Sequence, residues 1–269
     1  MTAFALIAFA ANSVFCRLAL ADGNMDATTF TVVRLLSAAV VLSIIGLHQQ
    51  GRTVLAYGSW QAAACLFVYA AAFSYAYVSL ATATGALILF AAVQFTMIAV
   101  AIWRGQHVQR WEWAGLLLAA TGFVWLTLPS ASAPSLAGLL LMSISGVAWG
   151  AYTLLGHQST HAVLDTAGNF IRTIPAVVIL AVLTLPSMHW SHAALGWAIA
   201  SGTLASAIGY VLWYQALRHL STPRAAVLQL LVPVIAAAGG VMIGELITVD
   251  LMIASSLILG GVWLVIAAR

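Results

Sequence analysis

Residues 83–103 read ATGALILFAAVQFTMIAVAIW, a run without a single charged side chain. Gln94 is the one amide in it, and no proline interrupts it. About 20 mostly apolar residues in a helix cross the hydrocarbon core of a bilayer. This stretch therefore predicts a transmembrane helix, and the rest of the chain can be examined for others like it.

The composition predicts a membrane protein throughout. Of the 269 residues 64% are hydrophobic and 6% are charged, and the mean hydropathy is +1.07. Roughly a quarter of the residues of a soluble domain are charged. The nine basic residues are all arginines and form no basic run, so nucleic acid is not an expected partner. Cys16 and Cys65 lie in apolar segments and are predicted to be free thiols.

Ten such runs can be recognised, and the connections between them are too short for a soluble domain. The first run is too long for the core of a signal peptide and is predicted to be a retained helix. The predicted spans are 2–20, 28–48, 58–79, 83–103, 111–128, 135–156, 164–185, 193–215, 222–243 and 249–268. The predicted fold class is an all-α polytopic membrane protein with ten transmembrane helices.

The arginines predict the orientation in the membrane. With a cytoplasmic N-terminus, the opposite side receives Arg17 together with most of the acids. Cytoplasmic loops of membrane proteins carry an excess of Lys and Arg. Both termini are therefore predicted to be cytoplasmic. The arginines placed on that side are Arg52, Arg104, Arg110, Arg218, Arg224 and Arg269.

An internal repeat divides the chain into two halves. An offset of about 139 residues places Gly105-Gln106 on Gly244-Glu245, Gln94 on Pro233 and Gly122 on Gly261. A chance match among similar apolar helices is the alternative explanation. The prediction is a five-helix repeat over residues 1–130 and a second over 135–269. Because five is odd, the second copy would be inverted, and inverted repeats in carriers place the substrate site near the bilayer midplane.

The chain resembles the EamA type of the drug/metabolite transporter superfamily. The resemblance rests on Asn12-Ser13 and the run Trp149 to Tyr152 near the start of each half, on the arginines that enter the second and seventh spans, and on Pro233 and Gly244-Glu245. The first half departs from the family pattern, since Ala10-Ala11 stands where Trp-Gly is usual. The sequence as a whole is similar to YddG-type exporters of aromatic amino acids in the bacterial inner membrane.

Polar and aromatic residues inside the spans are candidates for a substrate site. Unpaired polar groups are costly in hydrocarbon, so they either line a cavity or bond between helices. Amides and hydroxyls would suit a zwitterionic head group, and aromatic rings an apolar tail. The alternative is that they only join helices. The predicted substrate-binding residues are Asn12, Tyr75, Ser79, Gln94, Trp149, Tyr152, Tyr210, Tyr214 and Gln229.

Two prolines inside predicted spans are candidates for a gate or hinge. Pro233 removes a backbone donor and frees a carbonyl near Gln229, and Pro175 has the same effect in the seventh span. The freed carbonyl could bind a substrate ammonium. A tolerated kink is the simpler interpretation.

Arg34 and Arg172 lie about two turns inside their helices at matching positions of the repeat. An arginine at that depth must reach the interface, find a partner or face water. The favoured interpretation is that each reaches the interface or helix-end carbonyls. Contact with a substrate carboxylate is the alternative.

The acids limit the substrate class. All six lie at or near predicted helix ends, namely Asp22, Asp26, Glu112, Asp165, Glu245 and Asp250. Exchange of cationic drugs for protons commonly uses a buried carboxylate. A neutral or zwitterionic small molecule, carried without ion coupling, is therefore predicted.

The remaining motifs have ordinary structural explanations. His157 and His161 have a metal-pair spacing, as His189 and His192 nearly do, but both pairs are predicted to be loop histidines, so neither a metal nor a cofactor is expected. Gly146 and Gly150 form one GxxxG pattern, and Gly240 and Gly244 form another. Such patterns permit close helix packing, either within a monomer or between subunits of a dimer.

The prediction is a transporter that exports aromatic or neutral amino acids, or similar small metabolites, by alternating access in the bacterial inner membrane. An exporter of neutral lipophilic compounds or drugs is the transport alternative. A membrane scaffold or an intramembrane enzyme is the alternative of another class. No catalytic motif supports an enzyme. The expected partners are the small-molecule substrate and the bilayer, and whether the chain is a monomer or a homodimer stays open.

Overall fold

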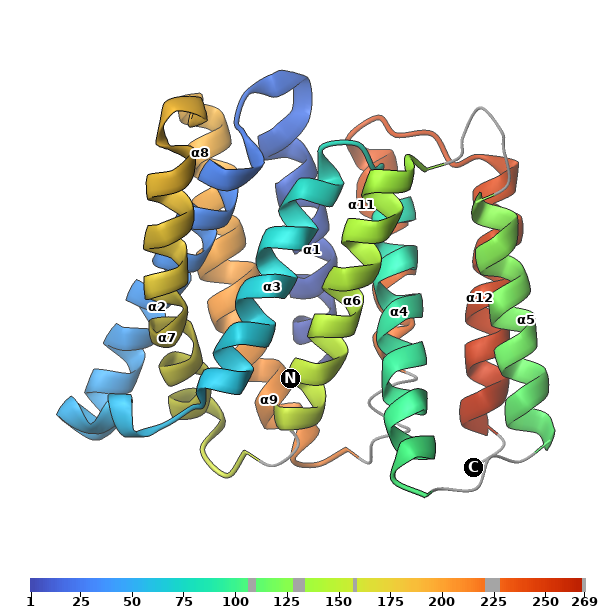
Figure 1. Cartoon of the computed structure of the whole chain (residues 1–269), viewed down its shortest axis with the longest axis horizontal. Coiled ribbons are helices and arrows are strands. Elements are labelled where there is room, and N and C mark those ends of the chain that lie inside the picture. The colour runs from blue at the N-terminus through green and yellow to red at the C-terminus, as the bar shows by residue number, and fades with distance from the viewer. Residues whose placement is uncertain (106–109, 128–133, 157–158, 221–227, 268–269) are drawn as a thin grey trace.

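The computed structural model describes residues 1–105, 110–127, 134–156, 159–220 and 228–267 as a bundle of helices (Figure 1). Short 3-10 turns at Ala21–Gly23, Gly51–Ala56 and Leu185–Ser187 join some of them. The long helices are α1 (Thr2–Leu20), α2 (Ala27–Gln50), α3 (Trp60–Tyr77), α4 (Thr82–Trp103), α5 (Arg110–Thr127), α6 (Leu136–Gly156), α7 (Ala162–Thr184), α8 (His192–Ala200) continued by η4 (Ser201–Ile208) and α9 (Gly209–Leu217), α11 (Leu231–Met242) and α12 (Val249–Ala267).

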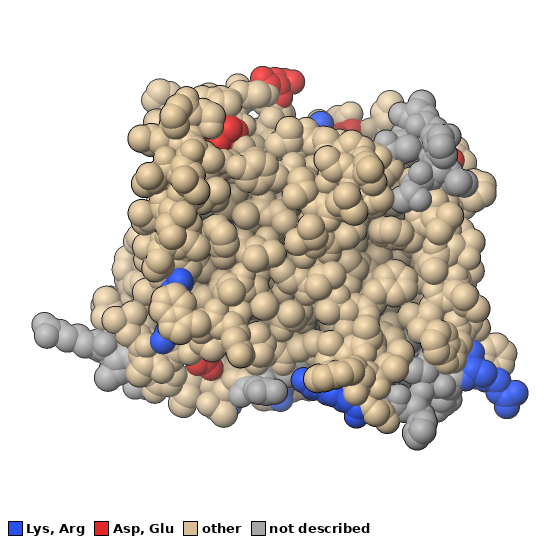
Figure 2. Space-filling view, viewed as in Figure 1, with Lys and Arg blue, Asp and Glu red and all other residues tan. Residues whose placement is uncertain are grey.

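Among the described residues, each predicted span overlaps a single long helix, except the eighth, which overlaps α8, η4 and α9 in series. Six helices of the described part are long and apolar enough to cross a membrane, and three shorter ones are apolar as well. The sides of the bundle are covered by exposed leucine, valine, isoleucine and tryptophan side chains. Charged side chains gather near its two ends (Figure 2). A soluble protein rarely exposes so continuous an apolar surface. The chain is thus an all-α polytopic membrane protein, as predicted.

The helices run alternately between two ends of the bundle (Figure 1). We call the end nearer the chain termini the lower end, as it is drawn, and the opposite one the upper end. α1 runs from the lower end to the upper end, whereas α6 runs downward. The first helix of each predicted half therefore enters from a different side, which is the arrangement that an inverted repeat requires.

The packing partners also interchange between the halves. α2 packs on α7, and α5 packs on α12. α6 packs on α3 and α4, while α1 packs on α8–η4–α9 and on α11. Exchanging the first five helices for the second five leaves this pattern of neighbours unchanged. A repeated five-helix unit would produce such a pattern.

Two glycines of the predicted repeat end equivalent helices. Gly105 follows α4 with φ +81°, and Gly244 follows α11 with φ +90°. Only glycine adopts this left-handed conformation at little cost, and it commonly closes a helix C-terminus. The N–H groups of Gly244 and Glu245 return to the carbonyls of Val241 and Gly240. Gly244 is therefore a helix cap, and the prediction that it forms a packing motif with Gly240 was wrong.

The other GxxxG pattern is a packing motif within the monomer. A Cβ on Gly146 would lie 2.5 Å from the carbonyl oxygen of Leu89 and 2.6 Å from Ala92. A Cβ on Gly150 would lie 3.1 Å from Thr96. Both glycines thus let α6 approach α4 closely.

Two aspartates join the halves at opposite ends of the bundle. Asp26 precedes α2 and accepts the N–H of His189 at 2.8 Å. Asp165, about 139 residues later, accepts the N–H of Gly58 at 3.0 Å. Burial raises the pKa of Asp26, but hydrogen bonds from Thr29 and His189 outweigh it and hold the pKa below its ordinary value. Each carboxylate thus anchors a loop of the other half.

A π-helix interrupts the eighth span. In η4 the hydrogen bonds run from residue i to i+5, which places residues five apart near the same face. Ser201 and Ser206 both point into the protein and are fully buried. Gly202 lies against α2, where an added Cβ would collide with the backbone oxygen of Arg34 and with Ser37. This close approach brings η4 next to the segment of α2 that contains Arg34.

We expect Gly202→Ala to lower the unfolding temperature by several degrees, because overpacking a close contact costs about 1–3 kcal/mol. Gly196→Ala is the matched control on α8, since no atom lies within 4 Å of its added Cβ. Thermal unfolding of the purified protein, followed by tryptophan fluorescence, measures both. Equal unfolding temperatures would show that α2 and η4 do not touch as described.

Candidate substrate site

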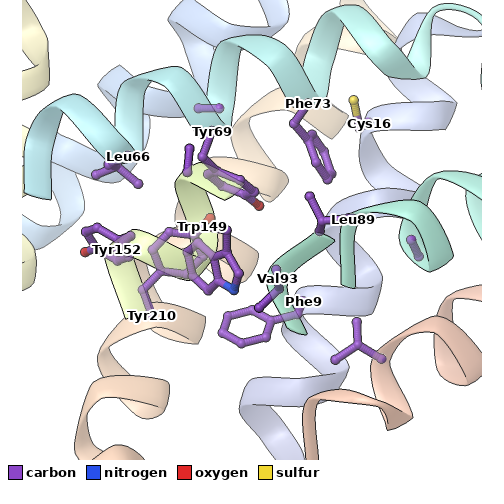
Figure 3. Close-up of a cluster of buried hydrophobic side chains, with 14 of the residues drawn as sticks. Phe9, Cys16, Leu66, Tyr69, Phe73, Leu89, Val93, Trp149, Tyr152 and Tyr210 are labelled. Carbon is purple, nitrogen blue, oxygen red and sulfur yellow. The ribbon is translucent and has the colours of Figure 1, made fainter. Parts of the chain in front are cut away.

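A cluster of aromatic side chains lies in the middle of the bundle (Figure 3). The ring of Trp149 lies 4.8 Å from that of Tyr210 and 4.9 Å from that of Tyr69. The same indole is 5.3 Å from Phe9 and stacks on Tyr152 at 5.5 Å. These rings come from α1, α3, α6 and α9, so that both halves of the chain contribute. We call these five residues the central aromatic cluster.

Arg34 of α2 lies beside this cluster and is 1% exposed. Its Nη2 donates to the hydroxyls of Tyr210 at 2.8 Å and Tyr69 at 3.1 Å. Its Nε donates to Ser206 at 3.0 Å. The guanidinium also lies over the rings of Tyr69 and Phe73. The prediction that Arg34 reaches the interface or helix-end carbonyls was therefore wrong, because the hydroxyls of α3, η4 and α9 give it polar partners in the interior.

Arg172, its counterpart in the repeat, behaves as predicted. It donates to the carbonyl oxygens of Leu55 at 2.7 Å and of Tyr57, in the loop before α3, and to Gly168 of its own helix. The two matching arginines thus have different environments. One lies in the core, and the other holds a loop at the lower end.

Asn12 joins this network from α1. Its Nδ2 donates to Tyr69 at 3.3 Å, and its Oδ1 accepts from Ser201 at 2.5 Å. The Tyr69 hydroxyl therefore accepts from Asn12 and from Arg34 together. Ser201 and Ser206 reach the two ends of this chain of bonds from the π-helix. Arg34, Tyr69, Tyr210, Ser206, Asn12 and Ser201 form what we call the Arg34 network.

Gln229 meets the cluster from the second half. The indole Nε1 of Trp149 donates to Gln229 Oε1 at 3.3 Å. Pro233 is the third residue of α11 and is buried, and the helix is interrupted at Leu230, just before it. This break is the expected result of a proline that removes a donor. Pro175 lies on the exposed side of α7, which stays helical around it.

The structure brings together most of the predicted substrate-binding residues. Asn12, Trp149, Tyr152, Tyr210 and Gln229 lie in or beside the cluster. Tyr214 stacks on Tyr152 at 5.2 Å. Gln94 is buried on α4, the helix from which Leu89 and Val93 face the cluster (Figure 3).

Two predicted residues lie elsewhere. Tyr75 is 38% exposed, and its hydroxyl bonds to Thr28 at 2.6 Å. Ser79 lies near the end of α3 and bonds to Ser135 at 2.8 Å. Helix geometry explains the position of Tyr75, since the sixth residue after Tyr69 does not share its face. Ser79 lies beyond Tyr77, the last residue of α3.

Sequence reasoning left Tyr69, Ser201 and Ser206 out of the predicted substrate-binding residues. It gave contact of Arg34 with a substrate carboxylate only as the alternative. Tyr69, Phe73 and Tyr77 are four residues apart and form one buried face of α3. That spacing was the signal for Tyr69. No comparable pattern marks Ser201 and Ser206, because they share a face only in a π-helix.

An ion pair joins the two halves at the upper end of the bundle. Arg17 Nε donates to Glu245 Oε1 at 3.2 Å, and Glu245 Oε2 accepts the N–H of Thr82 at 2.8 Å. α1, the start of α4 and the connection from α11 to α12 therefore meet there. These helices belong to both halves, so the pair ties one half to the other.

A pocket of about 280 Å³ opens at the lower end. Its lining includes Gly58 and Ser59 before α3, Asp165 and Asn169 of α7, and Tyr214. Tyr214 is also the member of the aromatic stack nearest to this pocket. We call the pocket the lower vestibule, since one tyrosine layer separates it from the central cluster.

The histidines show no metal site in the described part of the chain. That part contains no group of three or more His, Cys, Asp or Glu side chains placed to hold an ion. The His161 ring packs edge-on against Tyr57, and His189 contacts Asp26. His157 lies outside the described residues.

A bundle of lipid-facing helices around a buried polar and aromatic cluster defines a multi-pass membrane protein. Comparison with known proteins agrees with this class. Residues 136–267 match the EamA-like transporter family. An uncharacterized protein of Pseudomonas aeruginosa is 45% identical over all of this chain and 94% of its own length.

More distant similarities are consistent with this match. A protein of Archaeoglobus fulgidus described as an uncharacterized transporter is 25% identical over 71% of this chain and 70% of its own length. A crystal structure superposes with a TM-score of 0.67 at 20% identity, over 98% of this chain and 96% of the other, which shows a shared fold. The chain belongs to the EamA-like transporter family, and it is a membrane transporter of small molecules.

We expect Tyr69→Phe to destabilise the protein by about 1–3 kcal/mol, because Arg34 and Asn12 lose a shared acceptor in the interior. Tyr75→Phe on the same helix removes a hydrogen bond at the periphery and should cost less than about 0.5 kcal/mol. Denaturant unfolding of the two variants in the same detergent gives the comparison. Equal losses would contradict the placement of Tyr69 in the Arg34 network.

Proposed function

We propose that this protein exports aromatic or other neutral amino acids, or similar small zwitterionic metabolites, by alternating access. The observation that carries the proposal is the central aromatic cluster with its Arg34 network. It combines hydroxyls, amides and aromatic faces from both halves, deep inside the bundle. Such a site suits a solute with one polar head and an apolar remainder.

Alternating access is supported by the arrangement of the two predicted halves, 1–130 and 135–269. α1 and α6 enter from opposite ends, and the packing partners interchange between halves. In carriers of this design the substrate site lies between inverted repeats, and rocking of the halves exposes it to each side. The contacts between the halves at Arg17–Glu245 above and at Asp165–Gly58 below are the proposed closures of the bundle. A transport cycle would break one closure while keeping the other.

The interior chemistry disfavours cation exchange. The described carboxylates of Asp22, Asp26, Asp165, Glu245 and Asp250 lie at or near the helix ends. A facilitative mechanism is therefore the simplest proposal. The exporter of neutral lipophilic compounds remains the alternative, since the aromatic rings alone would suit such molecules.

We further propose that the protein lies in the bacterial inner membrane with both termini in the cytoplasm. Arg104, Arg110 and Arg218 follow or begin helices at the lower end, where the termini also lie (Figures 1 and 2). Asp22 and Asp26 lie at the opposite end. A cytoplasmic excess of arginine supports this orientation. The side chains of Arg52, Arg224 and Arg269 fall outside the described part.

Uptake into proteoliposomes tests the function directly. The panel contains labelled aromatic, aliphatic and charged amino acids, a polyamine and a sugar phosphate, with and without pH and sodium gradients. We expect saturable uptake of neutral amino acids that needs no gradient. Asn12→Ala and Trp149→Ala should lower it at least about tenfold, since each removes a group from the cluster. Ser79→Ala is the control, and proton-driven polyamine uptake would contradict the proposal.

Cys16 offers a native reporter of the upper closure. It is fully buried on α1, next to Arg17, and is one of the buried side chains drawn in Figure 3. A buried thiol reacts slowly. In a Cys65→Ser background, Glu245→Gln should speed labelling of Cys16 by a membrane-impermeant maleimide roughly fivefold. Loss of about 1 kcal/mol of closure energy changes an equilibrium by about that factor.

Asp22→Asn serves as the matched control for this experiment, since Asp22 is an exposed acid at the same end. It should leave the labelling rate unchanged. Equal rates for Glu245→Gln and Asp22→Asn would mean that the ion pair does not restrict access from the upper side.

A further inference from the structure

The guanidinium of Arg34 has N–H donors that no described residue accepts. An arginine side chain carries five N–H donors, of which Nε has one and each Nη has two. The Nε donor and both Nη2 donors are used by Ser206, Tyr69 and Tyr210. Nη1 is fully buried and has no hydrogen-bond partner among the described residues. Two adjacent donors on a permanent cation therefore remain available in the interior.

Arg34 also has no anionic partner in the described structure. The ion pairs found there join Arg17 to Glu245 and His189 to Asp26, both at the upper end. The groups that face Arg34 are the neutral hydroxyls of Tyr69, Tyr210 and Ser206 and the ring of Phe73. A buried charge without a counter-ion is costly in a membrane protein, and such residues usually mark a substrate or ion pathway.

We propose that Arg34 binds the carboxylate of the transported solute, with a carboxylate oxygen accepting from Nη1. This proposal rests on the proposed transport function and narrows its substrate class to solutes that bear one carboxylate. The carboxylate supplies the missing counter-ion, and the guanidinium fork suits it geometrically.

The surroundings of Arg34 define the remainder of the solute. Tyr210 connects Arg34 to the central aromatic cluster, since its hydroxyl accepts from Arg34 and its ring lies 4.8 Å from Trp149. The rings of Phe9 and Phe170 each lie within 6 Å of the Tyr210 ring. A carboxylate held at Nη1 would therefore place its apolar or aromatic group among these rings. Phosphates are disfavoured, because the described part of the site offers one cation for two or more charges.

The lower vestibule gives this site an entry route. Tyr214 lines the vestibule and stacks on Tyr152 at 5.2 Å, and the Tyr152 ring lies 6.3 Å from Tyr210. Three tyrosines thus lie in sequence between the vestibule and Arg34. Because Arg34 is 1% exposed, a solute reaches it when these rings separate.

Matched ligand pairs test the proposal on the unmodified protein. We would measure thermal stabilisation of the purified protein and proteoliposome uptake for 3-phenylpropanoate against 3-phenylpropanamide, and for phenylalanine against phenylalaninamide. The members of each pair are nearly isosteric, but only the acids carry a carboxylate. We expect the acids to bind and to be transported at least about tenfold better, the effect of one charge-assisted hydrogen bond.

Variants then assign the preference to Arg34. Arg34→Gln should reduce the ratio of acid to amide to about one, whereas Arg34→Lys should keep part of it because the charge is retained. Arg172→Gln is the matched control, since it removes the repeat-related arginine that binds loop carbonyls. It should leave the ratio unchanged. If Arg34→Gln does not fold, the ligand pairs on the unmodified protein still decide the question.

The outcomes separate this inference from the transport function. Equal transport of acids and amides would overturn the carboxylate site and leave the transporter intact. Stabilisation by the acids without uptake of any solute would support the site and overturn the proposed function. Stabilisation by chloride over isethionate, lost in Arg34→Gln and not competed by the acids, would mean that Arg34 holds an inorganic anion, and the proposal would fail.

Discussion

The burial of one arginine is the constraint on which the interior of this bundle depends. A guanidinium cannot lose its proton in a protein, so Arg34 must be solvated by the fold itself. The fold does this with hydroxyl oxygens from α3, η4 and α9 around a residue of α2. The same hydroxyl of Tyr69 also accepts from Asn12 of α1. One charge thus connects five helical segments that are far apart in the sequence.

The choice of hydroxyls instead of a carboxylate has a functional consequence. A buried Asp or Glu beside Arg34 would form a permanent ion pair and satisfy the charge in every conformation. Hydroxyls solvate the cation and leave its charge uncompensated, so that a ligand with a negative group gains from entering. Because a ligand shifts a conformational equilibrium only through different affinities for its states, an uncompensated charge provides the energy for coupling binding to a conformational change.

The sequence predicted the helices well and part of the candidate site, for physical reasons that differ. The apolar runs had to match the bilayer thickness, so the spans of α1 and α4 could be found to within a residue or so. Asn12, Trp149 and Tyr210 were found because polar and aromatic groups stand out in apolar helices. Tyr75 and Ser79 were included because the face of α3 was not resolved. The environment of Arg34 was predicted wrongly because its long side chain can extend either to the interface or into the protein. The inward direction depends on the hydroxyl that η4 supplies, and the π-helical geometry of η4 has no recognisable sequence pattern.

The contrast between the centre and the ends of the bundle follows from the same energetics. Arg17 and Glu245 are partly exposed, and such pairs contribute at most about 1 kcal/mol. Asp26 and Asp165 hold loops through single N–H groups of the opposite half. These contacts are strong enough to bias the bundle toward a closed state and weak enough for thermal motion to break. The centre is held by many buried contacts across both halves, so a rocking motion about it would open one end at a time and keep the Arg34 network continuous.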